Sequence, residues 1–282
     1  GRLGRSWVNA EGRALYYTAV IREPLAQPAT LPLLASLAVR EQLARRYGVD
    51  CQIKWPNDLL LNGKKIVGIL CESVSYGYQM QGRGIVCGIG INLAQPQSYF
   101  DAADLPNGTS LELQGAAVDL DADPQWLAEA LTDFGFDRPL YTFAREGFAP
   151  FREEYKAACI NLGRHVTFDL PGGELGSGTA IDVDADGQLI VRTDSGEEKV
   201  FTGEVSVHGI YGAINFSAPL RLCGPSGPGG AFCFPREGCG DLGSPHSFPQ
   251  RRFAGVRLWK TPGPKIPEGR AVFLPGAKCL RK

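Results

Sequence analysis

The sequence is poor in the residues from which common metal and covalent catalytic sites are built. Its 282 residues include only three histidines, and none of its eight cysteines forms a C-x-x-C pair. Structural zinc is usually held by cysteine and histidine at such short spacings, so a zinc site has little support. There is also no triad-like Ser/His or Cys/His signature of a protein nucleophile.

Charge imbalance and long apolar runs are missing as well. The formal net charge is −1, which gives no strong attraction to nucleic acid or to an anionic membrane. No apolar run approaches the roughly 18 residues of a membrane span, and the first residues do not form a signal peptide. We therefore expect a cytoplasmic protein with no membrane partner, and no nucleic-acid partner from the residues present. With 44% hydrophobic and 21% charged residues, the composition is that of an ordinary globular protein.

The first 160 residues mix strand and helix patterns. Gly48 stands where a C-cap glycine would end a helix over 31–47, and Asn62-Gly63 is a strong hairpin signal. Asp123-Pro124 predicts an N-cap followed by proline at the first helical position, and Pro139 should break or kink that helix. Aromatic, β-branched and apolar runs predict strands over 15–21, 52–55, 59–61, 66–73 and 84–92, and a further helix over 150–159.

Residues 163–213 follow a different pattern, that of short alternating strands. The strands recur at intervals of roughly ten residues and are separated by turn clusters rich in Gly, Pro and Asp. This pattern predicts a small β-barrel as a second domain. Its strands are expected over 165–170, 178–183, 188–193, 199–202 and 204–210.

Residues 216–282 change character again. They contain ten of the 20 prolines, and 11 Lys and Arg against 3 Asp and Glu. With no helical or strand periodicity, they are expected to be an irregular or disordered basic tail rich in Pro, Gly and Cys. The alternative is a basic segment that helps to recruit an acidic partner.

Three motifs carry candidate chemistry. The opening Gly1 to Trp7 (GRLGRSW) combines glycines, which allow close backbone approach, with arginines that bind anions. The segment Lys54 to Glu72 (KWPNDLLLNGKKIVGILCE) places lysine, asparagine and aspartate at a strand end, where carboxylate and amide oxygens suit Mg²⁺. The strand Gly88 to Asn92 (GIGIN) alternates glycines, so something packs against its backbone. Taken singly, the three could equally be a flexible end, a surface hairpin and a close strand contact.

Together these motifs resemble the biotin–protein ligase family, over residues 1 to about 213. The resemblance implies an α+β fold, a mixed sheet with flanking helices like the core of class II aminoacyl-tRNA synthetases, plus a small C-terminal SH3-like β-barrel. It implies a biotin- and ATP-binding catalytic domain over 1–160 and the SH3-like domain over 163–213. Relative to the family pattern, the sequence begins inside the biotin-binding loop, as an N-terminally truncated chain would.

The resemblance also assigns residues. It implies that Lys65, Arg2 and Asp58 are catalytic, that Lys65 meets biotin's carboxylate and the activated phosphate, and that Asp58 holds Mg²⁺. Residues implied in binding biotin or the nucleotide are Gly1, Arg2, Gly4, Arg5, Trp7, Lys54, Asn57, Lys65, Gly68, Leu70, Gly88, Gly90 and Asn92.

The implied reaction couples biotin to ATP, with Mg²⁺, and then transfers biotin to a lysine. The intermediate would be biotinyl-5′-AMP, and the acceptor a biotin carboxyl carrier domain of a biotin-dependent carboxylase. Two alternatives stay open. One is a degenerate, non-catalytic module that binds biotin or the carrier, and the other a lipoate-ligase-like acyltransferase. The oligomeric state is also open, with a homodimer as one candidate.

Overall fold

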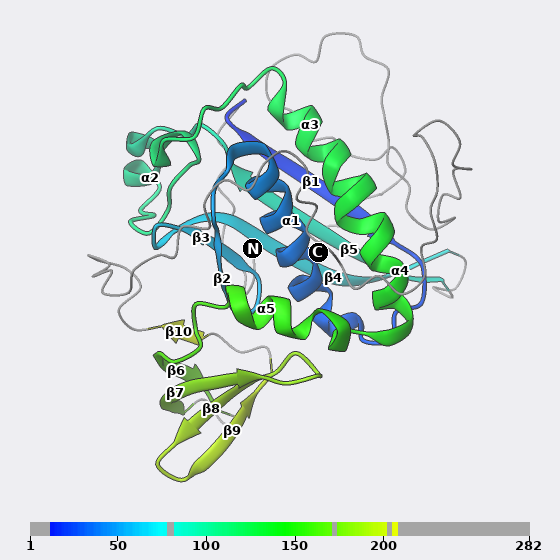
Figure 1. Ribbon diagram of the computed structural model, residues 1–282, viewed down its shortest axis with the longest axis vertical. Coiled ribbons are helices and arrows are strands. Elements are labelled where there is room, and N and C mark those ends of the chain that lie inside the picture. Colours follow the sequence, from blue (N-terminus) through cyan, green and yellow to red (C-terminus); the bar gives the residue numbers. More distant parts are fainter. Residues whose placement is uncertain (1–11, 78–81, 171–173, 202–204, 208–282) are drawn as a thin grey trace, which may run out of the picture.

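The computed structural model describes residues 12–77, 82–170, 174–201 and 205–207. In Figure 1 a larger α+β part lies above a small β domain, and α5 lies at the junction between them. The opening motif at 1–7 and the predicted tail at 216–282 lie outside the described residues. No helix within the described ranges is long and apolar enough to cross a membrane.

The larger part is built on a five-stranded sheet in the order β1-β5-β4-β3-β2. Neighbouring strands pair antiparallel, and two isolated parallel bridges, Ile53 to Cys159 and Lys65 to Gly108, add connections to later segments. The predicted strands are confirmed within a few residues. The strands are β1 (Ala14–Ile21), β2 (Gln52–Lys54), β3 (Asp58–Leu61), β4 (Lys64–Tyr76) and β5 (Gly82–Asn92).

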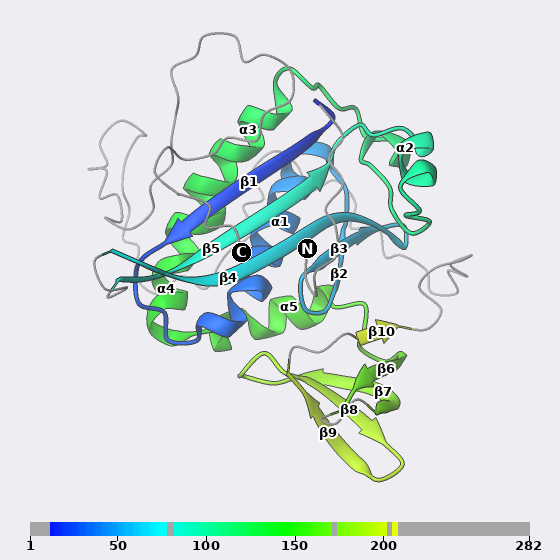
Figure 2. The same ribbon diagram turned by 180° about the vertical axis from the view of Figure 1, so that it is seen from behind.

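Helices α1, α3, α4 and α5 lie on one side of this sheet, in front of it in Figure 1. Seen from behind in Figure 2, the strands lie in front, and no helix of the described segments covers that face. The helices are α1 (Leu31–Tyr47), α2 (Gln97–Ala102), α3 (Asp123–Ala130), α4 (Asp137–Glu146) and α5 (Arg152–Ala158). Short 3-10 or π segments are η2 (Pro28–Thr30), η4 (Glu112–Gln114), η5 (Leu131–Phe136) and η6 (Ala149–Phe151).

Side-chain alternation along the strands explains the two different faces. On β1, Leu15, Tyr17 and Ala19 are buried, whereas Tyr16 and Thr18 are exposed. Because successive side chains point to opposite faces, the buried set faces the helices. Each buried leucine or isoleucine there contributes roughly 1.5–3 kcal/mol to folding. We name the opposite side, which bears Tyr16 and Thr18, the open face.

The predicted helix end at Gly48 and the predicted hairpin turn at Asn62-Gly63 are confirmed. Gly48 ends α1 with a left-handed φ of 67°, and its N–H donates to the Ala44 carbonyl. Asn62 and Gly63 have positive φ values of 50° and 76°, as a tight hairpin requires. These residues therefore determine where α1 ends and where β3 turns into β4.

The predicted start of α3 is wrong by one residue. Ala122 is the N-cap, and Asp123 is the first helical residue, with no side-chain capping bond. Its buried carboxylate instead accepts hydrogen bonds from Arg46 (2.7 Å), Tyr47 (2.8 Å) and the Asp119 N–H (2.9 Å). The Asp123 side chain, which the local pattern predicted to cap the helix, is thus bound mainly by residues of α1.

Pro139 was expected to break or kink the helical region, and α4 continues through the proline itself. Regular α-helical geometry is interrupted just before, in the π-helical η5. A proline lacks an N–H and clashes with the carbonyl four residues earlier, which is inside η5. The wider turns of η5 and the place of Pro139 near the start of α4 accommodate the ring.

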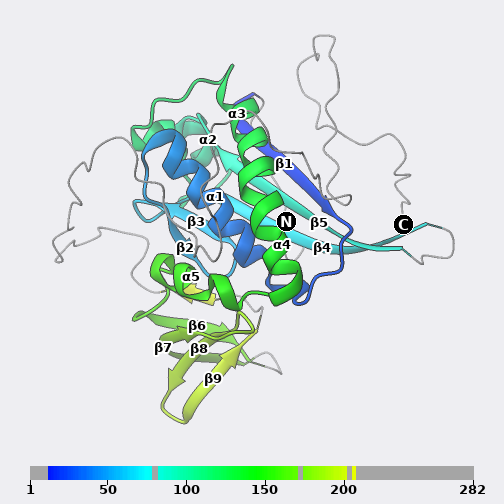
Figure 3. The same ribbon diagram turned by 45° about the vertical axis from the view of Figure 1, so that its right-hand side comes forward.

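The small domain is an antiparallel five-stranded sheet in the order β10-β6-β7-β8-β9. Figure 3 shows it next to α5. Its strands are β6 (His165–Asp169), β7 (Leu175–Val183), β8 (Leu189–Thr193), β9 (Gly196–Val200) and β10 (Val205–Val207). The fold class expected from the sequence, an α+β core followed by a small β domain, is confirmed.

The Asp123 cluster predicts a stability change with a defined pH dependence. Burial alone would raise the pKa of the Asp123 carboxyl, but the hydrogen bonds from Asp119, Tyr47 and Arg46 outweigh it and lower the pKa. A lowered folded-state pKa adds stability above the unfolded value near 4, and this stability is lost as the pH falls through the folded value. Because Asp123→Asn weakens the hydrogen bonds to a charged carboxylate, it should lower the free energy of unfolding by about 1.5–3 kcal/mol at pH 7.

Urea unfolding of the variant and the unsubstituted chain at pH 7 and at pH values below 4 measures this difference. The gap should narrow as the pH falls. The exposed Asp121 provides the control, because Asp121→Asn should change stability little. A gap that stays constant with pH would contradict this role of Asp123.

Candidate active site

One continuous row of residues crosses the sheet and brings several predicted site residues together. Lys54 of β2 pairs with Asp58 of β3, Asp58 with Gly68 of β4, Gly68 with Gly90 of β5, and Gly90 with Tyr16 of β1. Directly opposed residues of a sheet share a face. Since Tyr16 lies on the open face, the whole row does.

The centre of the open face is a floor of glycines. Two residues along the strands from the first row, Leu70 pairs with Gly88, which pairs in turn with Thr18. Among the described residues, a Cβ added at Gly88 would meet only the Leu70 carbonyl oxygen, at 3.7 Å. We name Gly68, Gly88 and Gly90 the glycine floor. Gly68 and Gly90 are buried and Gly88 is half-buried, so Gly88 is the position of the three at which a ligand has room to lie against the backbone.

Lys65 reaches this face through an irregularity in the ladder. It is three residues from Gly68, so in a regular strand its side chain would point to the opposite face. The pairing of β3 with β4 shifts after Leu59, which leaves Ile66 as an extra residue on β4. The Lys65 ammonium then meets the Asp58 carboxylate, with 2.6 Å between Nζ and Oδ1.

The charge at this end of the floor is positive on balance. Lys54 lies opposite Asp58 on β2 and Lys65 pairs with the same carboxylate, so two lysines flank one aspartate. The Lys65 side chain stays 41% exposed and Asp58 20%. Partly exposed lysines beside an open floor suit an anionic ligand, because the ammonium can contact it without deep burial.

Asn57 fixes the start of β3. Its side-chain amide donates to the Ile69 carbonyl, and the Ile69 N–H donates to the Asn57 carbonyl at 3.1 Å. Asn57 was predicted to bind biotin or the nucleotide. The contacts within the protein place it beside Asp58 with its amide group bound to β4.

Asn92 holds a segment that the sequence did not single out. Its Nδ2 donates to the Thr109 carbonyl (2.9 Å), and its Oδ1 accepts from Gln95 Nε2 (2.7 Å). The Lys65 N–H donates to Asn107 (2.7 Å), and Thr109 donates back to the Lys65 carbonyl (2.9 Å). Asn92 thus links the end of β5 to the backbone of Lys65, through contacts over long sequence separations that no local pattern signals.

The carboxylates that the structure describes near the floor do not gather into a metal-binding cluster. Within the described ranges, no three His, Cys, Asp or Glu side chains come close enough to hold a metal ion. Asp58 lies at the lysine end of the floor and is paired with Lys65, and Glu72 follows Leu70 on the same face of β4. A single carboxylate suits a Mg²⁺ ion that arrives already bound to phosphate oxygens. The arginines and Trp7 predicted in residues 1–7 lie outside the described residues.

Two family models match the chain. The biotin/lipoate A/B protein ligase family matches residues 1–92, and the biotin protein ligase C-terminal domain matches residues 162–207. The first contains β1 to β5 and the second the strands of the small domain. The matches therefore cover the glycine floor, the lysine pair and the domain next to α5.

Named relatives agree with the family models. The biotin–[acetyl-CoA-carboxylase] ligase of Paracoccus denitrificans is 33% identical over 73% of this chain and 84% of its own length. The bifunctional ligase/repressor BirA of Bacillus subtilis is 29% identical over 73% of this chain, which spans only 62% of that protein. Among solved structures, the biotin protein ligase of Aquifex aeolicus in complex with biotin and ATP has a TM-score of 0.57 at 25% identity, covering 73% of this chain and 83% of its own.

The link from Asn92 to Lys65 can be tested by hydrogen exchange. Asn92→Ala removes the bonds to Thr109 and Gln95, so the Lys65 and Thr109 amides should exchange roughly tenfold faster. The matched control is Gln97→Ala, whose side chain bonds to Asp101 on the exposed surface of α2. Unchanged protection of both amides in Asn92→Ala would show that Asn92 does not hold the segment.

Proposed function

The chain belongs to the biotin–protein ligase family, and we propose that it attaches biotin to a lysine of a biotin carboxyl carrier domain. The reaction would proceed through biotinyl-5′-AMP, with ATP as the source of the adenylate. The observation that carries the proposal is the position of Lys54, Lys65 and Asp58 at one end of the glycine floor.

The first step brings two anions together, so it needs cationic groups. Biotin's carboxylate attacks the α-phosphorus of ATP, and pyrophosphate leaves. Lys65 and Lys54 would offset the negative charge of the carboxylate and the phosphates, together with the predicted arginines Arg2 and Arg5. Mg²⁺ enters this scheme as part of the MgATP substrate, with Asp58 as the nearby carboxylate.

The glycine floor would bind biotin. Biotin's ring and chain are largely uncharged, and they need a surface without projecting side chains beside a polar end for the carboxylate. Gly68, Gly88 and Gly90 supply such a surface, with Leu70 as an apolar neighbour. Lys65 then stands at the end of the floor where the carboxylate would lie.

In the second step an acceptor lysine attacks the mixed anhydride. Its amine displaces AMP and forms an amide with biotin, and one proton must leave the amine. Asp58 is placed to orient that amine or accept the proton, because its carboxylate lies next to Lys65 at the reacting end. No protein nucleophile is needed.

Three further features of the proposal are inferred from the resemblance to the family and not from contacts in the structure. These are the carrier domain as partner, a homodimer and a cytoplasmic location. The lipoate-ligase alternative is disfavoured because the matched C-terminal domain is that of biotin protein ligases. The other alternative is a non-catalytic binding module, and a direct assay distinguishes it from a ligase.

The direct test is to incubate the full chain with MgATP, biotin and a carrier domain, and to measure biotinylated carrier by mass spectrometry. Product should depend on ATP and on the acceptor lysine, and lipoate should not replace biotin. If the chain binds biotin in calorimetry yet forms neither adenylate nor product, it is a binding module and the ligase proposal is wrong.

Lys65→Ala should lower the rate of biotin-dependent ATP–pyrophosphate exchange by about 10²–10³-fold, because the variant lacks the cation closest to the reacting carboxylate. The neighbouring Lys64→Ala is the matched control. It removes the same charge one residue away, from a side chain with no part in the proposed site, and should retain the rate. Equal losses in both variants would mean that general charge, and not the position of Lys65, matters.

A further inference from the structure

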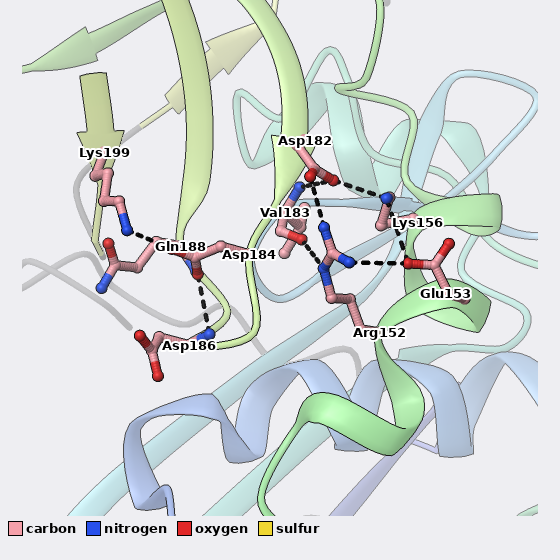
Figure 4. A network of polar contacts seen from close by, with 9 residues as sticks. All are labelled: Arg152, Glu153, Lys156, Asp182, Val183, Asp184, Asp186, Gln188 and Lys199. Carbon is pink, nitrogen blue, oxygen red and sulfur yellow. Dashed lines mark hydrogen bonds and ion pairs between the residues drawn. The ribbon is translucent and has the colours of Figure 1, made fainter. Parts of the chain in front are cut away.

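The small domain is attached to the core by an ion-pair cluster beside α5. Arg152 pairs with Asp182 and donates to the Val183 carbonyl, and Lys156 pairs with Asp182 at 2.8 Å (Figure 4). The attachment fixes the end of β7, and β7 leads directly into the turn 184–188.

The turn 184–188 is itself held in one shape. The Asp184 carboxylate accepts hydrogen bonds from the backbone N–H groups of Asp186 (3.0 Å) and Gln188 (2.9 Å) (Figure 4). Lys199 of β9 pairs with the same carboxylate at 3.1 Å. The turn is therefore a defined surface with which the small domain contacts the core.

Gly187 of this turn meets Trp55 of the KWPND segment. The Trp55 indole Nε1–H donates to the Gly187 carbonyl at 3.0 Å, inside the protein, where Trp55 is 2% exposed. Gly187 has a left-handed φ of 74°, and a Cβ there would lie 2.7 Å from Thr30 Cγ2. Only glycine fits the contact without displacement of the turn or of the start of α1.

The backbone of Trp55 and Pro56 is also held by hydrogen bonds to later segments of the chain. The Trp55 N–H donates to Asn161 Oδ1 at 2.8 Å, and the Tyr155 hydroxyl donates to the Pro56 carbonyl at 3.2 Å. Asn161 lies in the connection from α5 to β6, which also donates from the Ile160 N–H to the Ile53 carbonyl at 2.9 Å. In the described residues, these polar contacts of Trp55 and Pro56 come from α5 and from later segments of the chain.

Trp55 and Pro56 join Lys54 to Asn57 and Asp58. Lys54 and Asp58 are the two ends of this short connection and are paired across β2 and β3. A shift of the connection would therefore move the Asp58 carboxylate relative to Lys65. Misplacement of a reacting group by about 1 Å can cost two orders of magnitude in rate.

We infer that Trp55 is a positioning residue and that the small domain acts on the reaction through it. The Gly187 carbonyl fixes the Trp55 indole, and Trp55 in turn fixes Asp58 against Lys65. The inference rests on the proposed ligase function, because its main readout is the rate of adenylate formation. The small domain need not contact biotin or ATP for this effect.

The test is a double-mutant cycle in the full chain. Trp55→Phe removes the N–H donor and keeps an aromatic ring, and Gly187→Ala displaces the acceptor from the other domain. Each should lower kcat for biotinyl-adenylate formation about tenfold and leave the Kd for biotin within twofold, since the glycine floor is untouched. The double variant should lose no more than either single variant, because both remove the same contact.

The matched control is Gln27→Ala. Gln27 bonds to the same turn, to Asp186 Oδ1 at 3.0 Å, but its hydrogen bonds in the described part of the chain do not reach residues 54–58. The variant should lose stability yet keep kcat. Losses of kcat that multiply in the double variant, or a Trp55→Phe variant with unchanged kcat, would overturn the inference.

A second readout does not depend on activity. Backbone amide chemical shifts of Asn57 and Asp58 should change in Trp55→Phe and in Gly187→Ala in the same direction, and stay unchanged in Gln27→Ala. If the unsubstituted chain forms no adenylate, the proposed function fails while these shifts still test the positioning. Shifts that do not move would refute the positioning even in an active enzyme.

Discussion

The ion pair between Lys65 and Asp58 depends on one extra residue in a β-ladder. Without Ile66 as a bulge, Lys65 would point toward the helices, where an unpaired ammonium costs several kcal/mol or is driven out of the core. With it, the lysine joins the glycine floor and meets a carboxylate across the strand. The other contacts of the site hold this ion pair at the edge of the glycine floor.

These contacts come from parts of the chain that are distant in sequence. The backbone of Lys65 is bonded on both sides by the segment from Asn107 to Thr109, which Asn92 holds in place. The Asp58 end is held by Asn57 on one side and, through Trp55, by the small domain on the other. A site built on strand ends needs such outside support, because edge positions and connections have the fewest neighbours of their own.

Some features of the fold and of the site could be predicted from the sequence, and others could not. The hairpin at Asn62-Gly63 and the end of α1 at Gly48 follow from local backbone chemistry, and both predictions are confirmed. The set of glycines and lysines came from the resemblance to a family. The comparisons confirm the family, and the roles of these residues stay predictions. The side chain of Asp123 and the contact of Gly187 with Trp55 were missed, because their partners are 76 and 132 residues away and carry no periodic signal.

In the proposed complex, biotin lies on the glycine floor with its carboxylate toward Lys65. Gly88→Val tests this placement directly, since among the described residues a Cβ at Gly88 meets only the Leu70 carbonyl, and valine favours strands. We expect calorimetry to show biotin affinity at least about tenfold weaker while the urea midpoint is unchanged. A folded Gly88→Val variant that binds biotin as tightly as the unsubstituted chain would place the ligand elsewhere and contradict the account.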